Sequence, residues 1–179
     1  MNIQLLDKSF TIFITQAEIQ DKIKSIAEQI NIDFAGKSPI FLPVLNGAFL
    51  FASDLAKHIK LTCEFEFVKI SSYKGEISAK HQPFIMLGVE AATIQDKDVI
   101  VLEDIVDTGR TIEMLVHYLK QRNPKSIRVA CLFHKQKLSP SIHLDYVGFE
   151  IPNDFIIGYG LDYANLGRNL MDVYKLEAK

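Results

Sequence analysis

The chain has 179 residues, of which 48% are hydrophobic, and its formal charge at pH 7 is −2. A chain of this size forms one ordinary domain, and its hydrophobic fraction fills a core that needs no disulfide or structural metal. The charge gives no net attraction to nucleic acid or to an anionic membrane, and no segment approaches the ~20 apolar residues that span a bilayer.

The two cysteines and the N-terminal stretch indicate a cellular compartment. Cys63 and Cys131 lie far apart, each in an apolar run typical of a strand, which is the usual pattern of buried free thiols in a reducing environment. The stretch MNIQLLDKSFTIFITQAE lacks the basic start and continuous apolar run of a secretion signal. We therefore expect a soluble, cytoplasmic protein.

The first quarter of the chain carries one helical and one strand pattern. Thr15 and Glu18 fit a capping box and apolar residues follow at helical spacing, which predicts a helix over residues 16–31. Residues 39–45 form an apolar run typical of a strand that is buried on both faces, with Pro43 near its end.

Three further segments follow before the middle of the chain. Helical spacing returns over residues 46–59. Acidic and aromatic residues alternate over residues 63–73, which predicts a strand with one solvated face. Residues 71–83 are polar, contain a glycine and end in proline, so the sequence predicts a mobile loop that is too long for a tight turn.

The second half repeats the alternation of apolar strands with an amphipathic helix. The sequence predicts strands over residues 98–105 and 126–133, a helix over residues 111–122, and short late strands within residues 145–152 and 155–163. Alternating strands and helices predict an α/β fold with a central, mostly parallel sheet that helices cover on both faces. Ligands bind such sheets beyond the carboxyl ends of the strands, which is where EDIVDTGRT, residues 103–111, is expected.

Residues 103–111 combine two kinds of ligand-binding chemistry. Residues 107–111 supply a glycine, two hydroxyls, a cation and the N–H groups of a helix start, a set that suits a phosphate dianion. Glu103 and Asp104 have the wrong sign for phosphate, but they suit sugar hydroxyls, with a divalent cation to ease their repulsion. The run therefore predicts a site for a phosphorylated ribose.

The same run also has plain structural interpretations. Acids at a strand end are often solvated, and residues 108–111 could form a simple helix cap. The run is not a Walker loop or a dinucleotide fingerprint, because the glycine patterns that define them are absent. A plain interpretation suits any single residue better, whereas the complete run after an apolar strand favours function.

Two stretches resemble motifs of a known family. VIVLEDIVDTGRT resembles the phosphoribosyl-pyrophosphate binding motif of the type I phosphoribosyltransferases, and YVGFEIPNDFIIGYGLDY resembles the purine-binding region of the hypoxanthine-guanine phosphoribosyltransferases. The resemblance covers about residues 40–170. It implies a single phosphoribosyltransferase domain over residues 1–179, with a small purine-binding hood built from the N-terminal segment and residues from about 145 to 179.

The resemblance also implies an activity. The enzyme would transfer the 5-phosphoribosyl group from phosphoribosyl pyrophosphate to hypoxanthine, guanine or both, with Mg²⁺ as cofactor, and would form a dimer or tetramer. Two alternatives stay open: a phosphoribosyltransferase that prefers xanthine, and an RNA-binding regulatory protein on the same fold. A regulator of that kind needs a concentrated basic face, which the scattered lysines do not support.

The resemblance assigns roles around the sugar phosphate. Glu103 and Asp104 would hold the ribose hydroxyls, and Asp107 would act as the general acid–base toward N7 of the purine. Four residues would cradle the 5-phosphate: Thr108, Gly109, Arg110 and Thr111.

Further roles fall on the later residues. Lys135 would donate to O6 of the purine, Phe155 would stack on the base, and backbone groups near Ile156 would meet its other edge. Asp162, in the purine-binding stretch, would reach the magnesium ion together with Glu103 and Asp104, and Arg168 would meet the leaving pyrophosphate. Taken singly, these residues have plain interpretations as a surface lysine, a core phenylalanine, a turn acid and a solvated arginine.

The first pyrophosphate loop of the family often reads Leu-Lys-Gly, and here Leu45 and Gly47 flank Asn46. Asparagine cannot supply the positive charge of lysine, although Gly47 still permits close approach of the backbone N–H groups. Ser72 and Tyr73 match the start of the mobile catalytic loop of the family, which would close over the site as a lid.

Overall fold

The computed structural model describes residues 2–72, 84–136 and 142–177. Among these residues, seven strands form the larger sheet: β3 (Ile40–Leu45), β4 (Glu64–Phe65), β5 (Val68–Ser72), β6 (Phe84–Leu87), β7 (Asp98–Val106), β8 (Ser126–Lys135) and β9 (Tyr146–Ile151). Four described strands form a smaller sheet: β1 (Asn2–Leu5), β2 (Lys8–Ile14), β10 (Ile156–Ile157) and β11 (Val173–Leu176).

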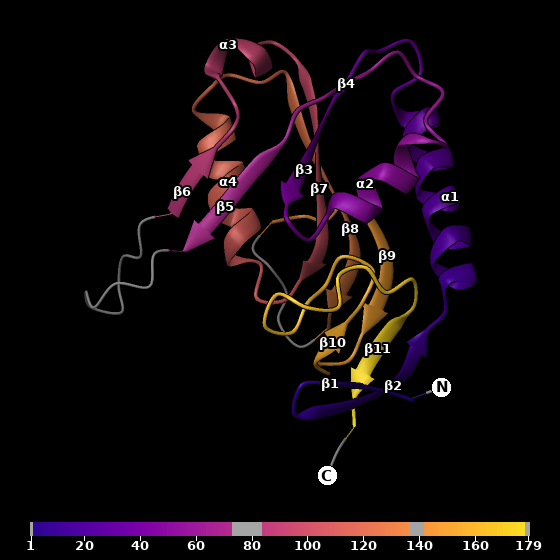
Figure 1. The fold of residues 1–179 in the computed structure, drawn as a ribbon. Helices are drawn as coiled ribbons and strands as arrows, with labels where there is room; N and C mark the ends of the chain where they lie inside the picture. The colour runs from indigo at the N-terminus through magenta and orange to yellow at the C-terminus, as the bar shows by residue number, and fades with distance from the viewer. Residues whose placement is uncertain (1, 73–83, 137–141, 178–179) are drawn as a thin grey trace.

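The larger sheet is mostly parallel, which confirms the predicted fold class. Its strand order is β6-β5-β3-β7-β8-β9, with β4 also pairing with β3, and β6 is antiparallel to β5. Helices α1 (Gln16–Asp33) and α2 (Phe49–Ala56) pack on one face, and α3 (Ala91–Ile94) and α4 (Arg110–Lys120) pack on the other. Figure 1 shows α1 and α4 on opposite sides of the sheet.

Local sequence signals account for the two longest helices. The Thr15 N–H donates to Glu18 Oε2 at 2.9 Å and the Glu18 N–H donates to Thr15 Oγ1 at 3.4 Å, so the predicted capping box forms at the start of α1. Helix α4 buries the four apolar residues that its helical spacing predicted: Ile112, Leu115, Val116 and Leu119. Because both patterns are local, both helices were predicted within a few residues of their bounds.

The strand predicted over residues 63–73 is interrupted, and its two pieces are β4 and β5. Ile40 lies opposite Glu64 and Val44 lies opposite Val68, so both pieces keep one register on β3. The Glu66 N–H donates to the Phe41 carbonyl at 3.0 Å, so the backbone groups of Phe41 and of Pro43, two residues on, face this strand. Pro43 has no N–H to donate, and the ladder is broken beside it.

The smaller sheet brings the two ends of the chain together. Its order is β1-β2-β11-β10, and Phe10, Ile157 and Tyr174 form the centre of a small core of its own. Figure 1 shows the carboxyl ends of β3, β7, β8 and β9 pointing toward this sheet. The strand ends of one sheet and the loops of the other therefore frame one region. None of the described helices is long and apolar enough to cross a membrane.

Candidate active site

The expected site residues lie where the larger sheet meets the smaller one. Leu45 ends β3, and Asn46 and Gly47 follow it in a turn. Glu103 and Asp104 lie near the end of β7, Thr108 and Gly109 precede α4, and Arg110 and Thr111 begin that helix. Lys135 ends β8, Phe155 precedes β10, Ile156 begins β10, and Asp162 and Arg168 lie between β10 and β11. Ser72 ends β5, whereas Tyr73 and the rest of the expected lid, residues 73–83, lie outside the described residues.

Asp107 and Lys135 meet although 28 residues separate them. Lys135 Nζ donates to Asp107 Oδ2 at 3.2 Å, and the side chain of Lys135 is only 12% exposed while that of Asp107 is 55% exposed. The contact forms because parallel pairing of β7 with β8 sets Val106 opposite His134. The interpretation of Lys135 as a surface lysine is wrong, since its side chain is largely buried and its ammonium group contacts the carboxylate.

The start of α4 offers backbone donors to an anion. Its N-cap is Gly109, which adopts a left-handed φ of +79° that glycine tolerates without a Cβ clash. Gly109 has no side chain to cap the helix, and the Thr108 hydroxyl accepts only a long 3.5 Å contact from the Arg110 N–H. The first N–H groups of a helix have no partner within the helix, and its dipole favours negative charge there. This geometry favours an anion site over a simple helix cap.

Glu103 and Asp104 are both 8% exposed but have different neighbours. They are consecutive in an extended strand, so their side chains leave opposite faces of the sheet. Glu103 pairs with Cys131 on β8 and its charge acts on that thiol. Asp104 lies against Gly47, where an added Cβ would come within 1.7 Å of Asp104 Oδ2, and its Oδ1 accepts a 2.9 Å hydrogen bond from the Ile105 N–H. These acids are buried within the last residues of the strand and are not solvated strand-end acids.

Burial makes both acids hard to ionise. Loss of solvation, followed by the charge of Asp104, raises the pKa of Glu103 well above its usual value. Loss of solvation also raises the pKa of Asp104 from 3.8 to about 6, although the Ile105 hydrogen bond and the charge of Arg168 oppose it. Carboxylates in this condition gain from hydroxyl donors or a cation, which is what a bound sugar and metal supply.

We expect Asp104→Asn to raise the free energy of unfolding of the ligand-free protein at about pH 8. The folded state raises the pKa of Asp104 from 3.8 to about 6, so its ionisation above pH 6 destabilises that state by up to about 3 kcal/mol. Below about pH 4 the group is largely protonated in both states and the penalty disappears. Urea unfolding at the two pH values measures the difference, with Asp21→Asn on the surface of α1 as the control. A gain of equal size at both pH values would contradict the assignment.

Asp104 belongs to a close-packed group that also contains Gly47, Gly160, Asp162 and Arg168. A Cβ on Gly160 would come within 2.1 Å of the Gly47 carbonyl oxygen, and Arg168 Nη1 donates to the Gly160 carbonyl at 2.7 Å. Arg168 Nη2 forms an ion pair with Asp162 Oδ1 at 2.5 Å. The interpretation of Arg168 as a solvated side chain is therefore wrong, because it is about a quarter exposed and binds both partners. Asp162 is a turn acid, since its Oδ2 accepts a hydrogen bond from the Asn165 N–H at 2.7 Å, but its other oxygen also binds Arg168.

The carboxylates fit a magnesium ion that is shared with a phosphorylated ligand. Glu103 Oε2 is buried and has no hydrogen-bond partner among the described residues. Those residues contain no group of three or more His, Cys, Asp or Glu able to hold a metal by themselves. Mg²⁺ is usually bound by one or two carboxylates, with water and substrate phosphates as its other ligands. Of the three expected ligands, Glu103 and Asp104 leave opposite faces of the strand and Arg168 already engages Asp162, so the structure does not bring all three together on one ion.

Phe155 forms an exposed aromatic platform with residues that the sequence did not indicate. It is 42% exposed, so the interpretation of Phe155 as a core residue is wrong. Tyr163 meets it edge-on with ring centroids 5.9 Å apart, and Phe10 lies 6.4 Å away. Lys8 Nζ lies 5.6 Å from the Phe155 ring centroid and 4.6 Å from that of Tyr163. The platform joins the two ends of the chain, so no local motif could reveal it.

Comparison with known proteins points to one family. The phosphoribosyl transferase domain family matches residues 14–164. A hypoxanthine-guanine phosphoribosyltransferase of Streptococcus mutans is 40% identical over 160 residues, which cover 89% of this chain and 88% of that protein. The bifunctional protein TilS/HprT of Listeria innocua is 37% identical over the same share of this chain, but the chain spans only 24% of its length.

A solved structure agrees in fold. The crystal structure of a hypoxanthine-guanine phosphoribosyltransferase from Bacillus anthracis, with a HEPES molecule in its active site, superposes with a TM-score of 0.84 at 33% sequence identity. The superposition covers 94% of this chain and 97% of that one. The likeness therefore extends over both sheets and the region between them.

Proposed function

The chain belongs to the hypoxanthine-guanine phosphoribosyltransferase family, and from that premise we propose that it makes purine nucleotides in salvage. It transfers the 5-phosphoribosyl group of phosphoribosyl pyrophosphate to hypoxanthine or guanine and releases pyrophosphate. The products are inosine and guanosine 5′-monophosphate.

The contact between Asp107 and Lys135 is the observation that carries the proposal. A 6-oxopurine that attacks C1 of the ribose through N9 changes its protonation at the imidazole ring, next to the O6 edge. An acid–base group and a hydrogen-bond donor are therefore needed side by side, and here they lie 3.2 Å apart. Asp107 exchanges the proton with N7, and Lys135 donates to O6.

The remaining residues hold the sugar and its two phosphate ends. The backbone N–H groups of residues 108–111 and the dipole of α4 bind the 5-phosphate. Glu103 and Asp104 accept hydrogen bonds from the ribose hydroxyls, while the guanidinium group of Arg168 and the Gly47 turn face the pyrophosphate. Fixing the ring in this way makes attack by the purine effectively intramolecular, and Arg168 stabilises the negative charge that develops on the leaving group.

Mg²⁺ is the proposed cofactor. Glu103, Asp104 and Asp162 are its proposed ligands, completed by the substrate phosphates and water, and the burial of Glu103 and Asp104 supports this assignment. When bound, the ion offsets the negative charge on the pyrophosphate.

The smaller sheet acts as the purine-binding hood. Phe155 offers an exposed ring for stacking, and the backbone at Ile156 faces the other edge of the base. Lys135 has no acceptor capacity, so the exocyclic amino group of adenine cannot form the hydrogen bond that O6 accepts from Lys135. Sites that bind a substrate oxygen in this way reject an analogue without it by ~10⁴-fold or more.

An activity assay with phosphoribosyl pyrophosphate, MgCl₂ and each base in turn tests the proposal. We expect nucleotide formation with hypoxanthine, guanine or both, and a rate lower by about 10⁴-fold or more with adenine. Activity with xanthine above that with the other two bases would reassign the substrate. Absence of product with every purine would overturn the function.

An RNA-binding regulator is not favoured, because the relatives carry the names of enzymes and the charge of −2 gives no attraction to RNA. Cytoplasmic location stays a prediction that the free thiols of Cys63 and Cys131 support. A dimer or tetramer also stays a prediction, which light scattering measures.

A further inference from the structure

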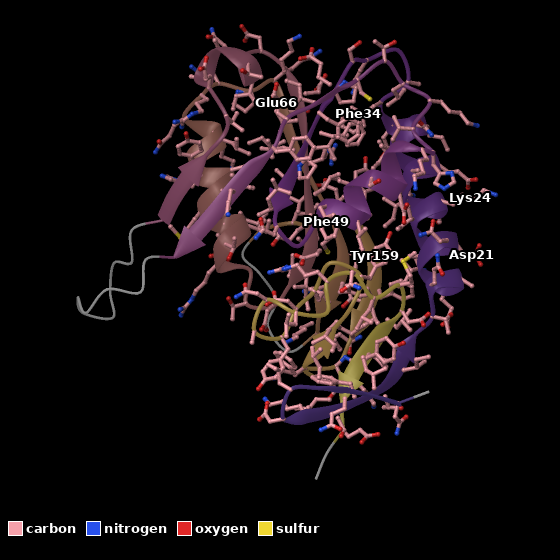
Figure 2. All side chains as sticks on the ribbon, in the orientation of Figure 1. Asp21, Lys24, Phe34, Phe49, Glu66 and Tyr159 are labelled. Carbon is pink, nitrogen blue, oxygen red and sulfur yellow. The ribbon has the colours of Figure 1, made fainter. Side chains whose placement is uncertain are left out.

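A buried hydrogen-bond network joins α1 and α2 to the loop that follows β10. The Tyr159 hydroxyl donates to Asp54 Oδ2 at 2.6 Å, and Gln20 Nε2 donates to the same oxygen at 2.6 Å. Lys57 Nζ donates to Asp54 Oδ1 at 2.5 Å. Tyr159 is 1% exposed, and Figure 2 shows it between the two helices and the smaller sheet. One carboxylate on α2 therefore ties three segments together.

Asp54 accepts these hydrogen bonds as an anion. Burial alone would raise its pKa, but the donors Lys57, Tyr159 and Gln20 hold that pKa below its usual value. Hydrogen bonds to an ionised acceptor are roughly twice as strong as those between neutral groups. The hydrogen bond between Tyr159 and Asp54 is therefore stronger than one between neutral groups.

On the loop side, Tyr159 is bound to the segment that carries Arg168. The backbone of Tyr159 has a left-handed φ of +48°. Its N–H donates to the Leu170 carbonyl at 2.8 Å. The next residue, Gly160, donates to the Arg168 carbonyl at 2.9 Å and accepts from Arg168 Nη1 at 2.7 Å. A shift of Tyr159 therefore moves both the backbone and the guanidinium group of Arg168.

On the helix side, Asp54 holds the element that carries the Gly47 turn. Helix α2 begins at Phe49, directly after the turn, and the Ala52 N–H donates to the Ala48 carbonyl at 2.8 Å. The turn also touches the loop directly, because Gly160 leaves no room for a Cβ against the Gly47 carbonyl oxygen. The distance between the turn and Arg168 is thus fixed by this contact and by the Tyr159–Asp54 hydrogen bond behind it.

We propose that Tyr159 and Asp54 are positioning residues for the pyrophosphate end of phosphoribosyl pyrophosphate. Their hydrogen bond sets the separation between the Gly47 turn and the Arg168 side chain, which contact that end of the substrate from two sides. The inference rests on the proposed function, because it takes the pyrophosphate to lie between these two groups.

Tyr159→Phe removes the hydroxyl and keeps the ring. We expect its affinity for phosphoribosyl pyrophosphate, measured calorimetrically with MgCl₂, to fall about ten-fold, the effect of one hydrogen bond worth about 1.4 kcal/mol. Its affinity for inosine 5′-monophosphate, which fills the phosphate, ribose and base positions but has no pyrophosphate, should change less than about two-fold. If Tyr159 served stability alone, the substitution would lower the affinity for both ligands equally.

Tyr146→Phe is the matched control. The Tyr146 hydroxyl donates to Asp33 Oδ2 at 2.7 Å, so it also joins a buried tyrosine to a helix acid, but it lies at the amino end of β9. We expect a similar loss of thermal stability and no change in either affinity. If Tyr159→Phe does not fold, Asp54→Asn carries the same comparison.

The two possible failures can be told apart. Wild-type protein that binds neither ligand would overturn the proposed function. The positioning role alone would be overturned if the wild-type protein bound both ligands and the affinities of the Tyr159 variant for them fell equally or not at all.

Discussion

Asp107→Asn is expected to lower kcat for nucleotide formation by about 10²–10⁴-fold, the usual contribution of a general acid–base group. Asparagine has the shape of aspartate and can still accept a hydrogen bond from Lys135, which lies 3.2 Å from Asp107 Oδ2, so the site should keep its geometry. It cannot exchange a proton with N7 of the purine. Because Asp107 is 55% exposed, replacing it removes little packing and should leave the stability of the fold nearly unchanged.

The binding of phosphoribosyl pyrophosphate separates this effect from general damage. Its affinity, measured calorimetrically in the presence of MgCl₂, should stay within about three-fold of the wild-type value, because the phosphate cradle of residues 108–111 keeps its backbone donors. Asp21→Asn makes the same chemical change on the exposed surface of α1 and should leave kcat unaltered. Turnover of the Asp107 variant at the wild-type rate would remove Asp107 from the mechanism.

The sequence predicted the elements whose signals are local. The capping box at Thr15 and the apolar spacing within α4 depend on residues a few positions apart, and both helices form as expected. Strand β7 and the turn after it lie in one continuous stretch, so a candidate phosphate site could be predicted before the fold was known. The sequence predicted the end of β8 at Phe133, but the strand continues to Lys135 because β9 pairs with it that far, with Lys135 opposite Ile151.

Contacts between distant segments could not be predicted in the same way. Strand β2 pairs with β11, and Phe10 lies beside Phe155 and Tyr163, across most of the chain. Strands β1, β2 and β11 were not predicted from the sequence. Each is too short or too irregular in its alternation to show a strand pattern, and β2 and β11 pair only across the length of the chain, in the middle of the smaller sheet. The motifs that resemble the family implied a hood, but they did not indicate Lys8 or Tyr163 beside Phe155.

The burial of Glu103 and Asp104 shows where local interpretation was incomplete. The strand predicted over residues 98–105 already contained both acids near its end, but the local sequence did not indicate that both would be buried there, as they are in β7. The signal for Asp104 lay in Gly47, more than fifty residues earlier, which leaves room for its carboxylate. Residues that serve a ligand rather than the fold are often placed at a cost in stability. The burial of the carboxyl groups of Glu103 and Asp104 in the ligand-free protein fits that pattern.

Lys135→Met is the second variant with a large expected effect. Methionine keeps most of the apolar stem of lysine and removes the donor to O6. We expect kcat/KM for hypoxanthine to fall roughly 10²-fold, because a hydrogen bond from a charged donor in a buried site is lost. The kcat/KM for adenine should change little, so the ratio of kcat/KM for hypoxanthine to that for adenine should fall by the same factor. The measurement is kcat/KM for each base, with the KM for phosphoribosyl pyrophosphate as the internal reference.

Lys24→Met, on the exposed surface of α1, is the control for loss of a lysine charge. If Lys135→Met lowered kcat/KM equally for hypoxanthine and for phosphoribosyl pyrophosphate, that result would contradict a contact between Lys135 and the base. Lys135 also binds Asp107, so its removal could act through the acid–base group instead. The double variant with Asp107→Asn decides between these routes. If Lys135 acts on O6 alone, the two losses in kcat/KM multiply, whereas if it acts through Asp107, the second substitution adds little to the first.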